Sequence, residues 1–368
     1  MAGIGVNLKK IFSKNTITTH VYGFSYSVIA TIAPMLLVIA AIIIMQMFLG
    51  FSKVGYATRE LYSCTVLYIF IFALLTAAPF NAVLSKYLSD VIYNETYADI
   101  MACYYFGLGI NIVFSCIFGI PFCIWEHVVG KVPVYYVFTG YCGYVALVLV
   151  FYTMLYLSIC KDYKKISLFF FIGMSITVLL SLILVYIFEV AVTYAMLLSL
   201  VVGFVVIACL EFGLTKSYFR LNSGKYKEVY EYFKKYWKLI LTNFLYILGL
   251  YTHNFVFWGT DMRMVVVDSF VCMQPYDMAS FIAMFTNISA SVLFISRVEM
   301  HFHERYRAYS EAIIGGRGMD IENAKHPTDL SECDYYVLSL DIAQDGIGTN
   351  SCGPRCLEKY DLKPGEFS

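Results

Sequence analysis

The chain has 368 residues, of which 60% are hydrophobic and only 14% are charged, whereas a soluble domain carries roughly 25% charged residues. This composition excludes a globular protein that is solvated on all sides. The net charge of +0 hides an asymmetry around the sequence GGRG at 315–318, called the seam here. Residues 319–368 hold four Lys/Arg against ten Asp/Glu, so the preceding part holds 22 Lys/Arg against 16 Asp/Glu. The shift predicts two units with different properties.

Eight stretches before the seam are long and apolar enough to cross a bilayer as helices, which requires about 20 residues. They lie at 22–49, 61–84, 100–125, 132–160, 166–188, 190–214, 239–258 and 278–295. The sequence therefore predicts an all-α polytopic membrane protein with about eight transmembrane helices. We expect the eight cysteines of this part to be small buried residues with inert thiols, because most of them lie within these apolar stretches.

The loops between these stretches predict the orientation of the chain. With the N-terminus in the cytoplasm, the inside loops hold 17 Lys/Arg and the outside loops hold four. Cytoplasmic loops are enriched in Lys and Arg, so we expect a cytoplasmic N-terminus. The longest inside loop, 215–238, has the pattern of a basic amphipathic helix, with Tyr226, Val229, Tyr230 and Phe233 near one face. Such a segment either lies on the anionic inner leaflet or acts as a hinge or docking element.

Polar and helix-breaking residues within the crossings are candidates for a cavity lining. A proline removes a backbone hydrogen bond and kinks a helix, and such breaks mark cavities in transporters. The alternative is that each amide is satisfied by a neighbouring helix as a packing contact. The candidates are Pro34, Pro79, Asn81, Asn111, Asn243, His253 and Asn287. Glu189 and Asp277 are expected at the water interface near the outer ends of their helices.

Motifs for nucleotide or metal chemistry are missing from the sequence. It contains no Walker A motif, no dinucleotide-binding glycine pattern and no HExxH. His301 and His303 are two residues apart, so they point to different faces of a helix and do not form a metal site. Cys352 and Cys356 lack the second cysteine pair of a metal framework. We therefore expect no cofactor, no metal and no catalytic residues, and the partners to be membrane lipids and not nucleic acid.

Several short motifs, in order along the chain, carry a resemblance to a known family. They are MAGIGV at the start, LKKI at 8–11, SDVIY at 89–93, YTHNFVFW at 251–258, PYDM at 275–278, RVE at 297–299 and ERYR at 304–307. They resemble the PelG family, the membrane transporters of the Pel exopolysaccharide system. The residues of these motifs that we single out are Asp90, Asn254, Trp258, Asp277, Arg297, Glu299, Glu304, Arg305 and Tyr306.

This resemblance implies a fold and a function. PelG resembles the flippase superfamily, which implies two six-helix bundles around a central cavity and alternating access. It also implies a bacterial inner-membrane location, movement of a carbohydrate polymer or its precursor, and Pel synthase or export subunits as partners. About twelve helices are expected for the family, so eight helices suggest a first bundle and an incomplete second one. The expected organisation is a first bundle at 1–214, a linker at 215–238, the start of a second bundle at 239–316 and a tail at 317–368.

The tail resembles a different family. Its alternation at Tyr336, Leu338 and Leu340 predicts one short β-strand, and the order of its motifs resembles the C-terminus of family 2 β-galactosidases. That resemblance gives an alternative function, glycoside hydrolysis, but the paired carboxylates of hydrolysis belong to a barrel domain that we do not find in this sequence. A carbohydrate-sensing appendage is a third hypothesis. The fourth, which we favour, is a chimera of two genes joined at the seam.

Overall fold

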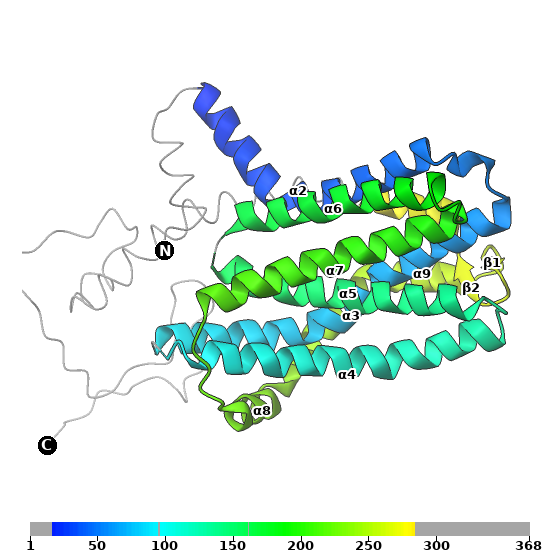
Figure 1. The fold of residues 1–368 in the computed structure, drawn as a ribbon. Coiled ribbons are helices and arrows are strands. Elements are labelled where there is room, and N and C mark those ends of the chain that lie inside the picture. Colours follow the sequence, from blue (N-terminus) through cyan, green and yellow to red (C-terminus); the bar gives the residue numbers. More distant parts are fainter. Residues whose placement is uncertain (1–16, 95, 161, 284–368) are drawn as a thin grey trace, which may run out of the picture. The chain divides into compact units, whose positions relative to one another are not determined.

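The computed structural model describes residues 17–94, 96–160 and 162–283, with side chains from residue 33 onward except Tyr93 and Ile159. Most of the predicted eighth crossing, the seam and the tail with its predicted strand lie outside these residues. The described elements follow one another as shown in Figure 1: α2 (Ile17–Phe48), η1 (Phe51–Lys53), α3 (Tyr56–Tyr93), α4 (Asp99–Val128), α5 (Val134–Ile159), α6 (Tyr163–Tyr186), α7 (Val192–Tyr218), α8 (Tyr226–Lys235), α9 (Trp237–Trp258), β1 (Met264–Val266) and β2 (Phe270–Cys272).

The long helices have the length and composition of membrane spans. Within the described residues, α3, α4, α5, α6, α7 and α9 are each long and apolar enough to cross a bilayer, and they correspond to the second to seventh predicted crossings. The first predicted crossing lies in α2, which has 32 residues, and the part of it whose side chains are described, Ala33–Phe48, is apolar. The predicted class, an all-α polytopic membrane protein, is confirmed.

The helices between α3 and α7 run alternately up and down, so their connections gather at two ends (Figure 1). We call these the hairpin end, which carries β1 and β2, and the α8 end, which carries α8. One hydrophobic core cluster joins α2, α3, α5, α6 and α7, and a second joins α3, α4, α5 and α8. Gly173 and Gly203 let α6 and α7 approach closely, since a Cβ on Gly203 would clash with the Thr177 hydroxyl, as small residues do between membrane helices.

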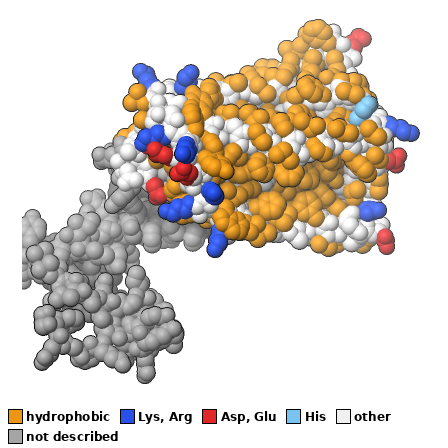
Figure 2. Space-filling view, turned by 90° about the horizontal axis from the view of Figure 1, so that it is seen from below, with side chains coloured by type: hydrophobic (Ala, Val, Ile, Leu, Met, Phe, Trp, Pro, Cys, Tyr) orange, Lys and Arg blue, Asp and Glu red, His pale blue; other side chains and the backbone are white. Residues whose placement is uncertain are grey.

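Hydrophobic side chains dominate the surface between the two ends. Figure 2 shows a broad apolar face on this part of the molecule, with the charged side chains gathered toward the ends. Exposed apolar residues on α4 and α6 include Val113, Ile117, Ile120, Ile124, Phe171, Leu179 and Ile183. A contiguous apolar surface of this extent is costly in water, so it fits the interior of a bilayer.

The hairpin between α9 and residue 273 has no counterpart in the sequence analysis, which placed only a loop there. β1 and β2 pair antiparallel, with Met264 opposite Cys272 and Val266 opposite Phe270. The turn places Val267 at φ 53° and Asp268 at φ 55°, a left-handed conformation that is unusual for a β-branched residue. Three-residue strands give too short an alternation to predict a hairpin from sequence alone.

The predicted basic amphipathic helix at 215–238 is shorter than expected. α7 continues to Tyr218, and α8 covers only Tyr226–Lys235. Val229 and Phe233 are buried against the bundle, whereas Tyr226 and Tyr230 are exposed. The predicted apolar face of this helix is therefore confirmed in part. Val229 and Phe233 pack against the bundle, whereas Tyr226 and Tyr230 do not.

Candidate functional site

A cavity of about 400 Å³ lies among α3, α4, α5, α9 and β2. Its wall is almost entirely apolar and aromatic, with a few polar side chains, as is usual for ligand pockets. The lining residues are Thr65, Tyr68, Ile69, Phe72, Leu75, Thr76, Phe118, Gly119, Phe122, Cys123, Glu126, Val132, Tyr136, Val137, Gly140, Tyr141, Tyr144, Phe244, Leu248, Phe255 and Phe270. These residues are brought together from four helices, one strand and the connection between α4 and α5, so the cavity exists only in the folded bundle.

The aromatic wall at the hairpin end is centred on Tyr68. Its ring stacks on Trp258 with centroids 5.0 Å apart and an angle of 1° between the planes, and it meets Phe270 edge to face at 5.0 Å. Phe122 adds a third ring, 5.8 Å from Tyr68. Aromatic pairs of this kind add about 0.5–1.5 kcal/mol each beyond their area burial, so they hold one side of the cavity rigid.

Hydroxyl groups of the wall are mostly paired with one another. Thr76 and Tyr144 share a hydrogen bond of 2.6 Å, and the Tyr141 hydroxyl donates to the Cys116 sulfur at 3.2 Å. The Tyr136 hydroxyl donates to Thr65 Oγ1 at 3.4 Å. These pairs satisfy the polar groups of the wall, and hydroxyl groups can act both as donors and as acceptors of hydrogen bonds.

Glu126 is the acidic residue of the cavity wall. Its Oε2 accepts a hydrogen bond from Ser269 Oγ at 2.8 Å, whereas its Oε1 is buried without a hydrogen-bond partner. The residue is 2% exposed. A buried carboxylate oxygen without a partner is costly, so Glu126 is a candidate for a functional residue.

The hairpin is held against the bundle by hydrogen bonds from three helices. Tyr68 Oη of α3 donates to Val271 O at 2.7 Å and accepts from Val271 N at 3.2 Å. Ser269 reaches Glu126 of α4, and Gln274 Nε2 donates to Glu60 of α3 at 3.3 Å. The hairpin therefore forms part of the cavity wall.

Asp277 is the hub of the third attachment, to α9. Its carboxylate accepts from Asn254 Nδ2 at 2.7 Å, from Trp258 Nε1 at 3.1 Å and from Met273 N at 3.0 Å. The prediction that Asp277 lies at the water interface is wrong, because the residue is buried. Residues singled out from two motifs thus meet in one cluster, which we call the Asp277 cluster: Asn254, Trp258 and Asp277.

The other predicted candidates do not line the cavity. Asn243 Nδ2 of α9 donates to the backbone carbonyl of Ala78, next to Pro79, which is a packing contact between helices. Asn111 Nδ2 donates to Gly107 O of its own helix at 2.8 Å. The Asn81 side-chain oxygen is buried without a hydrogen-bond partner.

Three further candidates also lie away from the cavity wall. The His253 ring lies 5.6 Å from the Tyr276 ring, and its Nδ1 is buried without a hydrogen-bond partner. Pro34 and Pro79 lie inside the helices α2 and α3, and neither is among the residues that line the cavity.

Some predicted candidates and motif residues fall outside the described residues. They are Asn287, Arg297, Glu299, His301, His303, Glu304, Arg305 and Tyr306. Within the part of the chain that the structure describes, no group of three His, Cys, Asp or Glu side chains could hold a metal ion.

The sequence analysis missed Glu126, Tyr68 and Ser269. Glu126 could have been noticed as a carboxylate directly after the predicted crossing at 100–125, and this is the only signal that the sequence offered. Tyr68 is one of 32 tyrosines, and Ser269 lies in a turn, so their roles depend on contacts between distant segments.

Two short hydrogen bonds to carboxylates lie toward the α8 end of the bundle, away from the cavity. Asp90 of α3 accepts a hydrogen bond from Tyr232 Oη of α8 at 2.5 Å, so this motif residue helps to hold α8. Burial and this hydrogen bond raise the pKa of Tyr232 above its ordinary value. Farther inside, Glu211 is fully buried and accepts from Thr153 Oγ1 at 2.5 Å, while its other oxygen has no hydrogen-bond partner.

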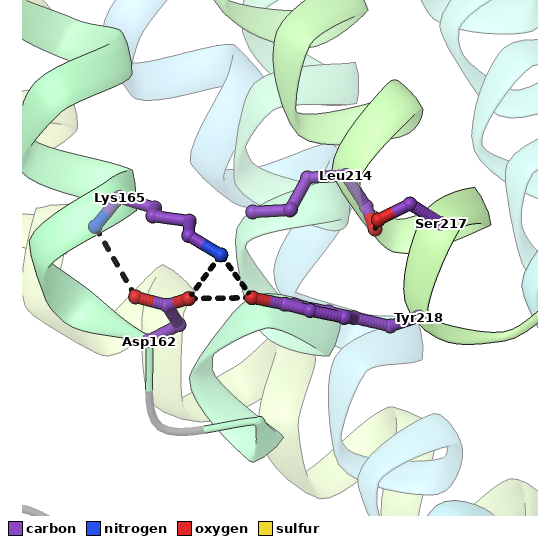
Figure 3. Close-up of polar contacts among 5 residues, drawn as sticks. All are labelled: Asp162, Lys165, Leu214, Ser217 and Tyr218. Atoms are coloured by element: carbon purple, nitrogen blue, oxygen red, sulfur yellow. Dashed lines mark hydrogen bonds and ion pairs between the residues drawn. The ribbon is translucent and has the colours of Figure 1, made fainter.

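A second cluster links the start of α6 to the end of α7 (Figure 3). Asp162 Oδ2 accepts from Tyr218 Oη at 2.6 Å and lies 3.0 Å from Lys165 Nζ, and Asp162 Oδ1 caps the helix by accepting from Lys165 N at 3.4 Å. Burial would raise the pKa of Asp162, but the hydrogen bonds from Tyr218 and Lys165 and the Lys165 charge outweigh it and lower this pKa.

The fold and the cavity define a class: a polytopic α-helical membrane protein whose bundle encloses an aromatic pocket closed by a hairpin. The family described as "Putative exopolysaccharide Exporter (EPS-E)", PelG, matches residues 1–329. The chain therefore belongs to the PelG family. This family is a transporter family and not an enzyme family.

The tail matches a second family, which confirms its resemblance to β-galactosidases. The family described as "Beta galactosidase small chain" matches residues 313–368, so the two matches overlap at 313–329, around the seam. A β-galactosidase from Actinobacillus pleuropneumoniae is 44% identical over 48 residues, which cover 13% of this chain and 5% of that enzyme. The chain thus spans about one twentieth of that relative. No solved structure matches the chain significantly.

Proposed function

We propose that this chain acts in the export of a Pel-type exopolysaccharide, as a transporter subunit that moves the polymer or a precursor across the bacterial inner membrane. The observation that carries the proposal is the match of residues 1–329 to the exopolysaccharide exporter family. The six long apolar helices and the apolar surface support a multi-pass membrane location. Membrane lipids and other Pel synthase or export subunits are the partners that this function requires.

The cavity is the proposed contact site for carbohydrate. Sugar rings have apolar faces that stack on aromatic rings, and the wall around Tyr68 supplies such surfaces. Sugar hydroxyls need acceptors and donors, which Glu126 and the paired Tyr and Thr hydroxyls provide. The buried Oε1 of Glu126 has no hydrogen-bond partner, and it would accept a hydrogen bond from a sugar hydroxyl once the wall opens to expose it. Alternating access of two bundles, as in flippase-like transporters, would open this cavity to either side.

The orientation of the proposed transporter follows the basic residues. With the N-terminus in the cytoplasm, the α8 end faces the cytoplasm and the hairpin end faces outward. α8 carries Lys227, Lys234 and Lys235, which suit the anionic inner leaflet. The hairpin and the Asp277 cluster then form the outer closure of the cavity.

A matched pair of glycine substitutions tests the role of the cavity. Gly140 lines the cavity, and a Cβ there would make only an ordinary contact of 3.5 Å with Thr65, whereas Gly109 is exposed on α4 with open space around it. Gly140→Leu should fill part of the cavity and reduce polymer export measured in cells that depend on this chain. Gly109→Leu should leave export unchanged. Equal export by both variants at equal membrane abundance would contradict a cavity role.

The alternative function, glycoside hydrolysis, is not part of the proposal. The similarity of the tail covers 48 residues and 5% of the enzyme that it resembles, and such a short match does not supply a pair of catalytic carboxylates. We propose that the tail is joined to the exporter sequence at the seam as a segment of separate origin.

A further inference from the structure

Two thiols from distant parts of the chain meet behind the cavity wall. Cys64 lies in the third turn of the long apolar helix α3, and Cys272 ends β2, 208 positions later in the sequence. They belong to one buried cluster with Val266 and Phe270. Their exposures are 2% and 3%, and the two thiols lie close enough to interact directly. The sequence analysis expected such cysteines to be inert, but two thiols in contact can react with each other.

The register of the hairpin on α3 explains why the thiols meet. Tyr68 lies one helical turn after Cys64, so both side chains lie on the same face of α3. Tyr68 holds the backbone of Val271 with two hydrogen bonds, at 2.7 Å and 3.2 Å. The residue after Val271 is therefore brought next to Cys64 by backbone contacts that do not involve the cysteines themselves. All eight cysteines of the described residues have free thiols.

We propose that Cys64 and Cys272 form a disulfide bond that fixes the β1–β2 hairpin to α3 at the cavity wall. The placement of this bond on the oxidising side of the membrane rests on the proposed orientation, with the hairpin end outward. The bond would act on the closure of the cavity, because Phe270 and Tyr68 on either side of it line that cavity. A disulfide there limits how far the hairpin separates from α3.

The reaction is thiol–disulfide exchange with an oxidised dithiol oxidoreductase or with glutathione disulfide. The Cys272 thiolate attacks one sulfur of the oxidant and releases its other sulfur as a thiolate, and Cys64 then attacks the mixed disulfide and releases the second one. Cys64 and Cys272 lose two electrons to the oxidant, and their two protons go to the released thiolates. The neighbouring Cys64 thiol lowers the pKa of Cys272, which favours Cys272 as the attacking group.

Peptide mapping of the full chain tests the proposal. Membranes are denatured in N-ethylmaleimide without reductant, digested and analysed by mass spectrometry. The purified protein is equilibrated with oxidised glutathione and then treated and analysed in the same way. We expect a linked Cys64–Cys272 peptide that disappears with dithiothreitol. Maleimide on both cysteines, or only glutathione adducts, after the oxidising equilibration would overturn the proposal. The mapping needs no transport, so its outcome is independent of the proposed function.

A stability measurement provides a second readout with matched variants. Oxidation should raise the thermal unfolding midpoint of the wild-type chain in detergent by about 5 °C relative to the reduced chain, because the bond closes a long loop. Cys64→Ser and Cys272→Ser should lose this redox dependence, and Cys209→Ser, which removes an exposed thiol of α7, should keep it. A redox-dependent midpoint that survives Cys272→Ser would assign the effect to other cysteines and contradict the proposal.

Discussion

At the scale of single residues, Asp277 is a buried carboxylate with several hydrogen-bond donors around it. Its two oxygens accept hydrogen bonds from three donors on α9 and on the segment after β2. Charge-assisted hydrogen bonds are the strong ones, and each donor that loses its buried partner costs about 1–3 kcal/mol. The residue thus holds α9 and the end of the hairpin together.

Asp277→Ala should therefore lower the free energy of unfolding by about 2–4 kcal/mol, because it leaves the Asn254, Trp258 and Met273 donors unpaired. Thermal unfolding of the purified chain, followed by circular dichroism, measures this change. Asp277→Asn, which keeps one acceptor oxygen, should be intermediate. Asp261→Ala, on an exposed turn, is the control and should unfold like the wild type. A wild-type midpoint for Asp277→Ala would show that the cluster is dispensable.

The stability of the chain should depend on pH through Asp162, which lies at the α8 end of the bundle. Its pKa is lower in the folded state than the ordinary value of about 3.9. Its contribution to stability is therefore fully present above about pH 4 to 5 and is lost as the pH falls toward the lowered pKa. Asp162→Asn should destabilise the chain by no more than about 0.5 kcal/mol at pH 7, since the ion pair is partly exposed.

The difference between wild type and Asp162→Asn should shrink when unfolding is measured at successively lower pH between 5 and about 3. Tyr218→Phe, which removes one of the hydrogen bonds to Asp162, should show part of the same effect. A difference that grows with acidity would have the wrong sign for a carboxylate stabilised in its charged form.

At the scale of elements, α8 shows how an amphipathic segment is docked. Val229 is fully buried, and the Phe233 ring lies 5.3 Å from Phe106 and 6.4 Å from Phe80. Tyr232 adds its hydrogen bond to Asp90. The bundle therefore holds one face of this helix, while its lysines remain exposed, which agrees with a helix that is packed against the bundle and also meets the membrane surface.

Phe233→Ala should loosen this docking by about 3 kcal/mol, the typical cost of truncating a buried Phe. Faster amide hydrogen exchange in α8, with unchanged exchange in α5 and α7, is the expected result. Tyr230→Ala on the exposed face should change the exchange of α8 far less, since Tyr230 is 59% exposed. Equal exchange in the two variants would mean that the Phe233 contacts do not hold the helix.

At the scale of the whole molecule, the proposed orientation predicts which end is accessible from outside. Lys53, at the hairpin end, and Lys227, on α8, are both exposed. In a background lacking Cys209, Lys53→Cys should react with a membrane-impermeant maleimide added to intact spheroplasts. Lys227→Cys should react only after the membrane is opened. The reverse pattern would invert the topology that the basic loops predict.

The tail gives a separate prediction. The purified chain should not hydrolyse a chromogenic galactoside above the rate of a sample without protein, because the tail matches only 5% of the length of its β-galactosidase relative. Turnover that copurifies with the chain and is lost when residues 317–368 are removed would contradict this expectation.

The sequence by itself determined the membrane class and the family of the exporter part. Crossing a bilayer requires about 20 apolar residues in a row, a local property, and six of the eight predicted crossings match helices of sufficient length among the described residues. The motifs YTHNFVFW and PYDM were also local signals, and they contain the residues Asn254, Trp258 and Asp277, which are joined by hydrogen bonds. Orientation remains a prediction from charge counts.

Only the tertiary structure decided where the site lies. Residues far apart in sequence form the cavity, and a helix in lipid is apolar on most faces, so periodicity does not say which face meets a partner. The hairpin, with three residues in each strand, is held against α3, α4 and α9. This position brings together three pairs of residues: Glu126 with Ser269, Cys64 with Cys272, and Asp277 with Trp258. Hydrogen bonds between distant segments fixed that position, and a linear sequence does not display them.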